Sequence, residues 1–205
     1  MSPVKKEIEN KMVITKQLIL LFLFCLNCNF SIAQDSNMSN PVKSFGADTI
    51  LWQRDSLLSF SDFKKKPSGS FQGLTYSGLY LDMKQEDHLV KVYCYVLFIC
   101  KESFLKDSSE SLLKHEQLHF DITELYARKM RQQLSQKNPD KEKSISAAIQ
   151  KTYNSIVIDL NDEQNRYDKE TIHGTNEIKQ LQWIDSIHKQ LNQLENYTES
   201  EVVFH

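Results

Sequence analysis

Glycine, proline and cysteine are all scarce in this chain of 205 residues, which contains only 5, 4 and 4 of them. Nothing in so glycine-poor a sequence resembles the glycine-rich loops that bind dinucleotides or phosphates. Two of the cysteines, Cys25 and Cys28, lie in an apolar N-terminal segment. Cys94 and Cys100 share one predicted strand, about 20 Å apart, and therefore cannot pair with each other. We expect them to be apolar fillers, so cysteine supplies no chemistry here.

The chain also lacks a charge excess, since its formal net charge is −2. This balance gives no reason to expect a nucleic-acid partner. Internal repeats and low-complexity segments are missing too, and the length suits a single domain. No Ser-His-Asp arrangement stands out that would indicate a serine hydrolase.

The longest apolar run is Leu18–Leu26, which is too short to span a bilayer comfortably. Lys11 and Lys16 flank its start, and Ser31-Ile32-Ala33 supplies small residues at cleavage positions. The pattern predicts a signal peptide over residues 1–33 that is cleaved after Ala33. The mature protein would then be exported, to the periplasm or outside the cell, and would contact the membrane only through this segment. A retained membrane anchor is the alternative.

The segments that follow divide the mature chain. Residues 34–48 are polar and predict a flexible leader, and residues 49–195 carry the domain. We expect residues 196–205 to form a fraying tail. Within the domain, Thr75–Met83 and Leu89–Cys100 alternate in the manner of strands around a polar turn, which predicts an antiparallel hairpin. Helical patterns follow: one continues to about Ser135, a second covers residues 141–165 with Ile158 among its inward positions, and a third runs from Glu163 to about Leu194.

The feature that organises the domain is His115-Glu116-Gln117-Leu118-His119. Ser108 or Ser109 can cap a helix here, and apolar residues recur at helical spacing with no glycine or proline before Pro139. Residues four apart share one helix face, so His115 and His119 can hold one metal ion. Glu116 lies beside them, where its carboxylate can act as general base toward a metal-bound water. The chemistry of such a site is that of a zinc hydrolase.

A catalytic zinc takes three protein ligands and one open position. Our candidate for the third ligand is His173, which precedes Gly174, the only glycine after Gly78. Glycine permits close backbone approach or local distortion beside a metal. Glu170 could orient His173 or replace it, and Asp168 is a weaker candidate for either role.

Two further residues could serve the site. Asp121 is a candidate to orient a zinc-binding histidine from outside the ligand shell. Tyr167 could donate to an oxyanion, although a tyrosine buried on the packing face is an equal alternative. His188 is predicted about 20 Å beyond His173 along a straight helix, too far for the same ion. His88 falls in the predicted polar turn of the hairpin and is expected to be exposed.

The segment Leu112–Ile122, which contains the motif, resembles the signature of a bacterial family of secreted zinc-dependent proteases. Further anchors of this resemblance are Ser59–Phe63 and Tyr167–Gly174, and the likeness runs from about Leu51 to about Trp183. Phe60 and Phe104 stand where the family often has tryptophan. The resemblance implies an α+β fold of the zincin-like metallopeptidase class. A small antiparallel sheet would pack on the active-site helix, with further helices following it.

Together these features predict an exported zinc metallopeptidase that hydrolyses a peptide or protein substrate. His115, His119 and His173 would bind Zn²⁺, and Glu116 would be the catalytic base. The competing hypothesis is a non-catalytic exported module of the same shape that binds peptides or cell-envelope material. An intact Glu116 favours the enzyme, because a binding module needs no general base.

Overall fold

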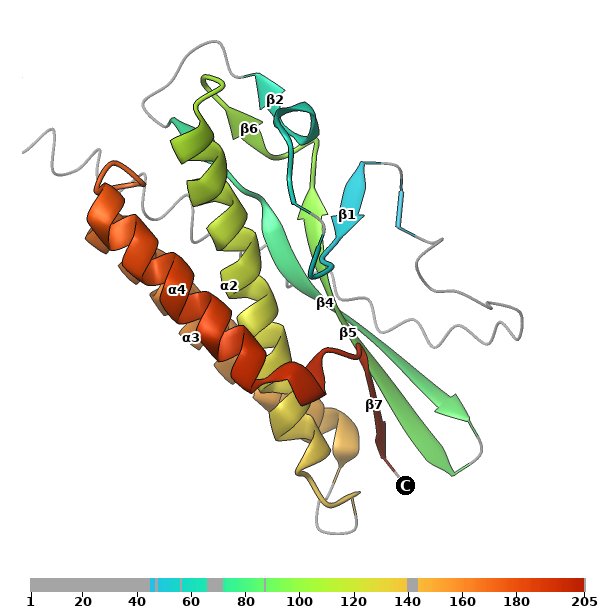
Figure 1. Ribbon diagram of the computed structural model, residues 1–205. Coiled ribbons are helices and arrows are strands. Elements are labelled where there is room, and N and C mark those ends of the chain that lie inside the picture. The colour runs from blue at the N-terminus through green and yellow to red at the C-terminus, as the bar shows by residue number, and fades with distance from the viewer. Residues whose placement is uncertain are drawn as a thin grey trace, which may run out of the picture. The chain divides into compact units, whose positions relative to one another are not determined.

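The long hairpin predicted from the sequence forms the centre of an antiparallel sheet. The computed structural model describes residues 45–204 except 47, 56, 66–71, 87 and 140–143. Strand β4 (Ser77–Glu86) pairs with β5 (Leu89–Ile99), from Ser77↔Phe98 to Glu86↔Leu89 (Figure 1). Alternate residues of β5 turn one face toward the helices, where Phe98 packs on Phe120 with ring centroids 5.7 Å apart. The hairpin is therefore confirmed, although β4 runs three residues further than predicted.

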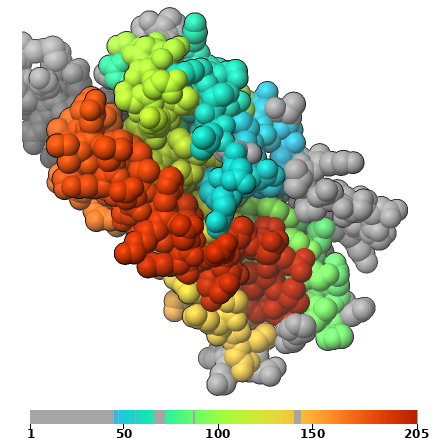
Figure 2. Space-filling view, viewed as in Figure 1, coloured from blue at the N-terminus to red at the C-terminus, as the bar shows by residue number. Residues whose placement is uncertain are grey.

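Two short strands extend this sheet on the other side of β5. Strand β1 (Thr49–Leu51) pairs with the C-terminal half of β5, and β7 (Glu201–Phe204) pairs with its N-terminal half, both antiparallel. Figure 2 shows the red C-terminal segment lying against the green hairpin. The expectation that the tail frays is wrong, because Val202 and Phe204 are buried in the sheet.

A second, smaller sheet lies near the start of the motif helix. It consists of β2 (Lys64–Lys65), β6 (Phe104–Leu105) and β3 (Gly73–Leu74) in the order β2-β6-β3, with β2 and β6 parallel. Strands of two residues carry no alternation that a sequence pattern could reveal. This sheet matters for the site because its strand β3 runs beside Glu116.

Three helices follow the strands. Helix α2 (Glu110–Ser135) contains the motif, and its N-cap is Ser109, whose hydroxyl accepts a hydrogen bond from the Leu112 amide. Helices α3 (Ile145–Thr171) and α4 (Glu177–Gln193) pack together on α2, on the side away from the sheet (Figure 1). The fold is thus α+β, with α2 buried between an antiparallel sheet and two helices. None of the helices in the described ranges is long and apolar enough to cross a membrane.

The turn between α3 and α4 has an unusual backbone. Ile172, His173 and Gly174 all have positive φ, at 51°, 52° and 80°. The sequence analysis expected a helix over residues 141–165 and another starting at Glu163, whereas α3 continues unbroken to Thr171. Non-glycine residues rarely adopt positive φ, and such strain persists only where the surroundings enforce it. Here the turn borders the site described below.

A buried ionic cluster joins the far end of α2 to the rest of the domain. Glu124 accepts hydrogen bonds from Arg128 and Arg131, with both N···O distances 2.9 Å. Arg131 also donates to the carbonyl oxygens of Cys94 in β5 (2.8 Å) and Tyr197 near the C-terminus (2.9 Å). Arg128 donates to the carbonyl of Leu191 in α4 at 2.7 Å. The cluster therefore links α2 to the sheet, to α4 and to the segment that leads into β7.

Removing Glu124 tests the importance of this cluster. Glu124→Ala leaves two guanidinium groups buried without a counter-charge, and we expect the free energy of unfolding to fall by about 3–5 kcal/mol. The measurement is urea unfolding followed by circular dichroism. Glu195→Ala is the control, because Glu195 pairs with Arg54 at the exposed surface (3.5 Å) and should cost less than about 1 kcal/mol. Equal losses in the two variants would contradict a stabilising role for the cluster.

Candidate metal centre

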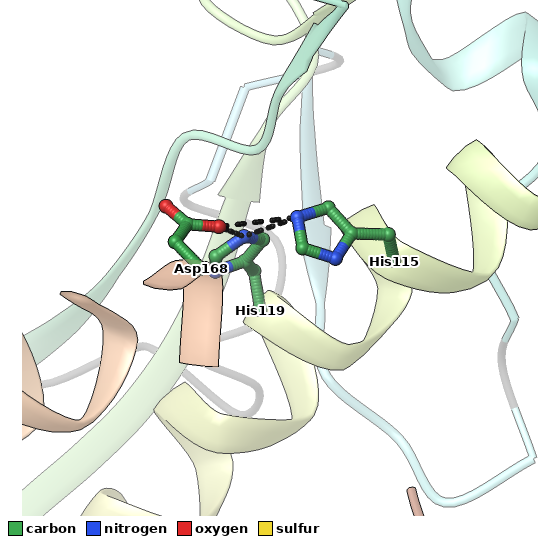
Figure 3. A group of neighbouring side chains, drawn as sticks. All are labelled: His115, His119 and Asp168. Carbon is green, nitrogen blue, oxygen red and sulfur yellow. Dashed lines mark hydrogen bonds and ion pairs between the residues drawn. The ribbon is translucent and has the colours of Figure 1, made fainter. Parts of the chain in front are cut away.

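Helix α2 directs His115 and His119 to the same point, one turn apart, as the motif predicted. Their Nε2 atoms lie 3.2 Å from each other. Asp168, in the last turn of α3, places Oδ1 3.1 Å from His115 Nε2 and 3.0 Å from His119 Nε2 (Figure 3). The three side chains therefore come from two helices that are distant in sequence and adjacent in space.

This arrangement has the chemistry of a metal site. In the part of the chain that the structure describes, no other group of three His, Cys, Asp or Glu residues brings its ligand atoms within 4.8 Å of one another. Imidazole nitrogen and carboxylate oxygen are ordinary ligands of divalent zinc, and three protein ligands leave one position open. The residues present therefore fit a metal site with one open coordination position.

The electrostatics of the cluster favour a cation between these atoms. Burial alone lowers the pKa of His119, but the charge of Asp168 and its hydrogen bond outweigh burial and raise the pKa to about 9. Burial likewise opposes ionisation of Asp168, yet His119 and His115 hold the pKa of its carboxyl well below the usual range. A positive charge, carried by a proton or a metal ion, is therefore stabilised at this point.

His173, the predicted third ligand, lies at the edge of the cluster. Its Nδ1 is 3.5 Å from Asp168 Oδ1, and its side chain is 64% exposed. It is not among the three residues whose ligand atoms converge. Ligation by His173 stays a prediction, while Asp168, which the sequence analysis ranked below it, occupies the better position.

The backbone at Gly174 approaches His115 closely and has a distorted conformation, as expected for this isolated glycine. Its φ is +80°, and a Cβ at this position would lie 2.9 Å from Cβ and Cγ of His115. Any side chain would displace the imidazole, so the backbone of the turn can approach His115 only because residue 174 is glycine. The prediction of close approach and local distortion at Gly174 is confirmed.

Glu116 is buried beside the cluster, with 3% of its surface exposed. Its Oε2 has no hydrogen-bond partner in the described part of the chain. Strand β3 covers the carboxylate so closely that a Cβ on Gly73 would lie 2.3 Å from Glu116 Oε1. Buried carboxylate oxygens normally have a hydrogen-bond partner, so the free Oε2 is available to a group that binds in the site.

Tyr167 supports the site through packing rather than facing a substrate. Its ring stacks on His115 with centroids 4.7 Å apart, and it is fully buried. Its hydroxyl lies 2.8 Å from Gln180 Oε1 and 3.2 Å from the His115 carbonyl oxygen. Since burial raises the pKa of Tyr167 far above its usual value, it remains protonated. Of the two alternatives in the sequence analysis, packing is therefore the one that the structure supports.

The remaining candidates have other partners. Glu170 accepts a hydrogen bond from Trp183 Nε1 at 2.9 Å, away from the cluster. Asp121 accepts from Trp52 Nε1 and from Gln117 Nε2, both at 2.9 Å. The structure does not support the expectation that Asp121 orients a zinc-binding histidine, because its carboxylate accepts hydrogen bonds from Trp52 and from Gln117 in the preceding turn of α2.

Part of the chain is similar to a known family. Residues 102–174 match a family described as bacterial protein of unknown function (DUF922). The matched segment runs from just before β6 through α2 and α3 to Gly174, so it contains His115, Glu116, His119 and Asp168. No curated protein and no solved structure matches the chain. The resemblance to a bacterial family is thus supported, and the description of that family specifies no activity.

Sequence reasoning underrated Asp168 and missed Gln164, whose amide lies against His119. The usable signal was their spacing, because residues 164 and 168 are four apart and share one face of α3. That signal was obscured because the sequence analysis divided the segment into two helices near residue 163.

Titration with Zn²⁺ can distinguish Asp168 from His173 as the third metal ligand. Asp168→Asn removes the carboxylate between the histidines, and we expect the dissociation constant to rise by more than about 100-fold, beyond the loss typical of residues outside the ligand shell. His173→Ala should change the dissociation constant far less. Isothermal titration calorimetry of both variants and wild type is the measurement. A loss confined to His173→Ala would restore His173 as the third ligand.

Proposed function

We propose that this protein is an exported zinc-dependent peptidase. The observation that carries the proposal is the convergence of His115, His119 and Asp168 beside a buried glutamate with an unpartnered oxygen. Two histidines one helical turn apart with an adjacent glutamate form the pattern of metal-dependent hydrolases. The N-terminal pattern supports export, although residues 1–44 lie outside the described part of the chain.

In this proposal His115, His119 and Asp168 would bind the ion, and Glu116 would accept and donate the proton. When bound there, zinc would supply the chemistry of a water of lowered pKa and of a polarised substrate carbonyl. Glu116 accepts the proton of the attacking water on Oε2, which has no competing hydrogen bond. The same carboxylate then delivers the proton to the leaving amine.

The strand arrangement supports an extended substrate. Thr75, just before β4, donates a hydrogen bond from Oγ1 to the Glu116 carbonyl oxygen at 3.0 Å. Within the described residues β4 pairs only with β5, so no described strand pairs with its other edge. An extended peptide could add to this edge through main-chain hydrogen bonds. A zincin-like domain would use its sheet in this way, and zincin identity is part of this proposal.

Replacing Glu116 separates an enzyme from a binding module. Glu116→Gln should keep zinc content and folding near wild type, because the amide has a similar size and does not ligate the ion. The amide cannot accept the proton, so peptide hydrolysis should fall about 10²–10⁴-fold, roughly 3–5 kcal/mol of barrier. The measurement is cleavage of a mixed peptide library by zinc-loaded wild type, the variant and a chelator-treated sample.

Two outcomes would count against the mechanism. Equal cleavage by wild type and zinc-loaded Glu116→Gln would remove Glu116 from the proton transfer. No cleavage of any library peptide by zinc-loaded wild type would favour the non-catalytic module that binds peptides or envelope material.

Gly73 provides an independent test of the Glu116 position. In Gly73→Ala the new Cβ would overlap Oε1, and the cheapest relief is rotation of the flexible glutamate. We expect peptide hydrolysis to fall at least about tenfold for a displaced base, with zinc affinity near wild type. Gly46→Ala is the matched control, since nothing lies within 4 Å of its Cβ and Gly46 lies outside β4. Unchanged hydrolysis in Gly73→Ala would show that the buried carboxylate position is not the one used in the reaction.

A further inference from the structure

Two glutamines lie behind the histidines of the site, on the side away from Asp168. Gln164 of α3 places Oε1 2.5 Å from His119 Nδ1. Gln180 of α4 places Oε1 3.2 Å from His115 Nδ1. Each imidazole is therefore contacted at both nitrogens, by a glutamine at Nδ1 and by Asp168 at Nε2.

The orientation of the Gln164 amide is set by its other contacts. Its Nε2 lies 2.9 Å from the His119 carbonyl oxygen, which can only accept a hydrogen bond. The amide nitrogen must therefore face that carbonyl, which leaves Oε1 facing His119 Nδ1. Because Oε1 is an acceptor, Nδ1 must carry the hydrogen, and the Nε2 lone pair is left for a metal ion.

Gln180 has a different environment. Its Oε1 accepts from Tyr167 Oη at 2.8 Å as well as from His115 Nδ1. Its Nε2 is buried and has no hydrogen-bond partner among the described residues. The oxygen of Gln180 thus accepts two hydrogen bonds, whereas its amide nitrogen donates none to the described residues.

We propose that Gln164 and Gln180 are positioning residues that fix the tautomer and ring orientation of His119 and His115 for metal binding. This inference rests on the metal site of the proposed function. It assigns α4, which lies outside the segment matched by the bacterial family, a direct part in that site. Partners of this kind commonly change metal affinity 10–100-fold when they are removed.

The difference between the two amides makes the proposal specific. A glutamate at position 180 keeps the accepting oxygen and loses only a nitrogen without a partner. A glutamate at position 164 turns an oxygen toward the His119 carbonyl, where two acceptors repel. The same substitution should therefore be tolerated at Gln180 and harmful at Gln164.

Zn²⁺ titration of the full mature chain tests this asymmetry. Gln164→Leu, Gln164→Glu and Gln180→Leu should each raise the dissociation constant about 10–100-fold. Gln180→Glu should bind Zn²⁺ as tightly as wild type or more tightly. Gln150→Leu on α3 and Gln182→Leu on α4 are exposed controls that should leave affinity unchanged. Weakening of Gln180→Glu to the level of Gln180→Leu would overturn the proposal.

A spectroscopic readout distinguishes positioning from a general loss of stability. In zinc-loaded protein with ¹⁵N-labelled histidine, the Nδ1–H protons of His115 and His119 should exchange slowly with water. Gln164→Leu should lose the His119 signal and keep that of His115, and Gln180→Leu should do the reverse. Retention of both signals in both variants would overturn the proposal.

The outcomes also separate this inference from the proposed function. Zinc binding that is insensitive to both glutamines removes the inference and leaves the peptidase proposal standing. Zinc binding that depends on both glutamines in a protein that cleaves no peptide removes the peptidase proposal alone. Failure of wild type to bind Zn²⁺ overturns both.

Discussion

Three electron-rich atoms, His115 Nε2, His119 Nε2 and Asp168 Oδ1, lie within 3.2 Å of one another. Such atoms repel unless a proton or a metal ion lies between them, so the arrangement must be held by the surrounding structure. The C-terminal end of α3 has to lie beside the first half of α2. The turn that follows α3 has to reverse the chain direction within a few residues, so that α4 packs against α2. The positive φ angles of Ile172 and His173 indicate the backbone strain of this reversal.

The first and the later turns of helix α2 have different roles. Its first turns carry the candidate metal ligands His115 and His119, whereas its later turns carry the buried charges of Glu124, Arg128 and Arg131. The later part links α2 to β5, α4 and the C-terminal segment through carbonyl contacts. The first turns, which carry the candidate site, are therefore held rigidly, because a site on a helix that is fixed at its far end cannot shift independently of the sheet.

Elements that follow one periodic pattern over a long stretch could be predicted most accurately. The hairpin strands and the span of α2 from its Ser109 cap to Ser135 follow from alternation, helical spacing and capping. The α3–α4 boundary was missed because polar residues run through both helices and only Gly174 marks the turn. Ile158, predicted to face inward, is 62% exposed, since the buried stripe of α3 passes through Ile149, Tyr153 and Ile156. The pairing of the tail in β7 and the convergence of Asp168 with the two histidines depend on long-range packing, which a local sequence pattern does not encode.

Two of the few glycines in this chain lie against residues of the candidate site. His115 and Glu116 are adjacent, so they point about 100° apart around α2, toward the helices and toward the sheet. A glycine meets each of them, Gly174 against the His115 ring and Gly73 against the Glu116 carboxylate. A Cβ at either position would displace the side chain that it faces, whereas nothing lies within 4 Å of a Cβ added at Gly46 or Gly78. Two of the five glycines are therefore the points at which the backbone closes on the candidate ligand and the candidate base from opposite sides. Gly73 lies within strand β3, so the close approach to Glu116, and not a turn, explains glycine at this position.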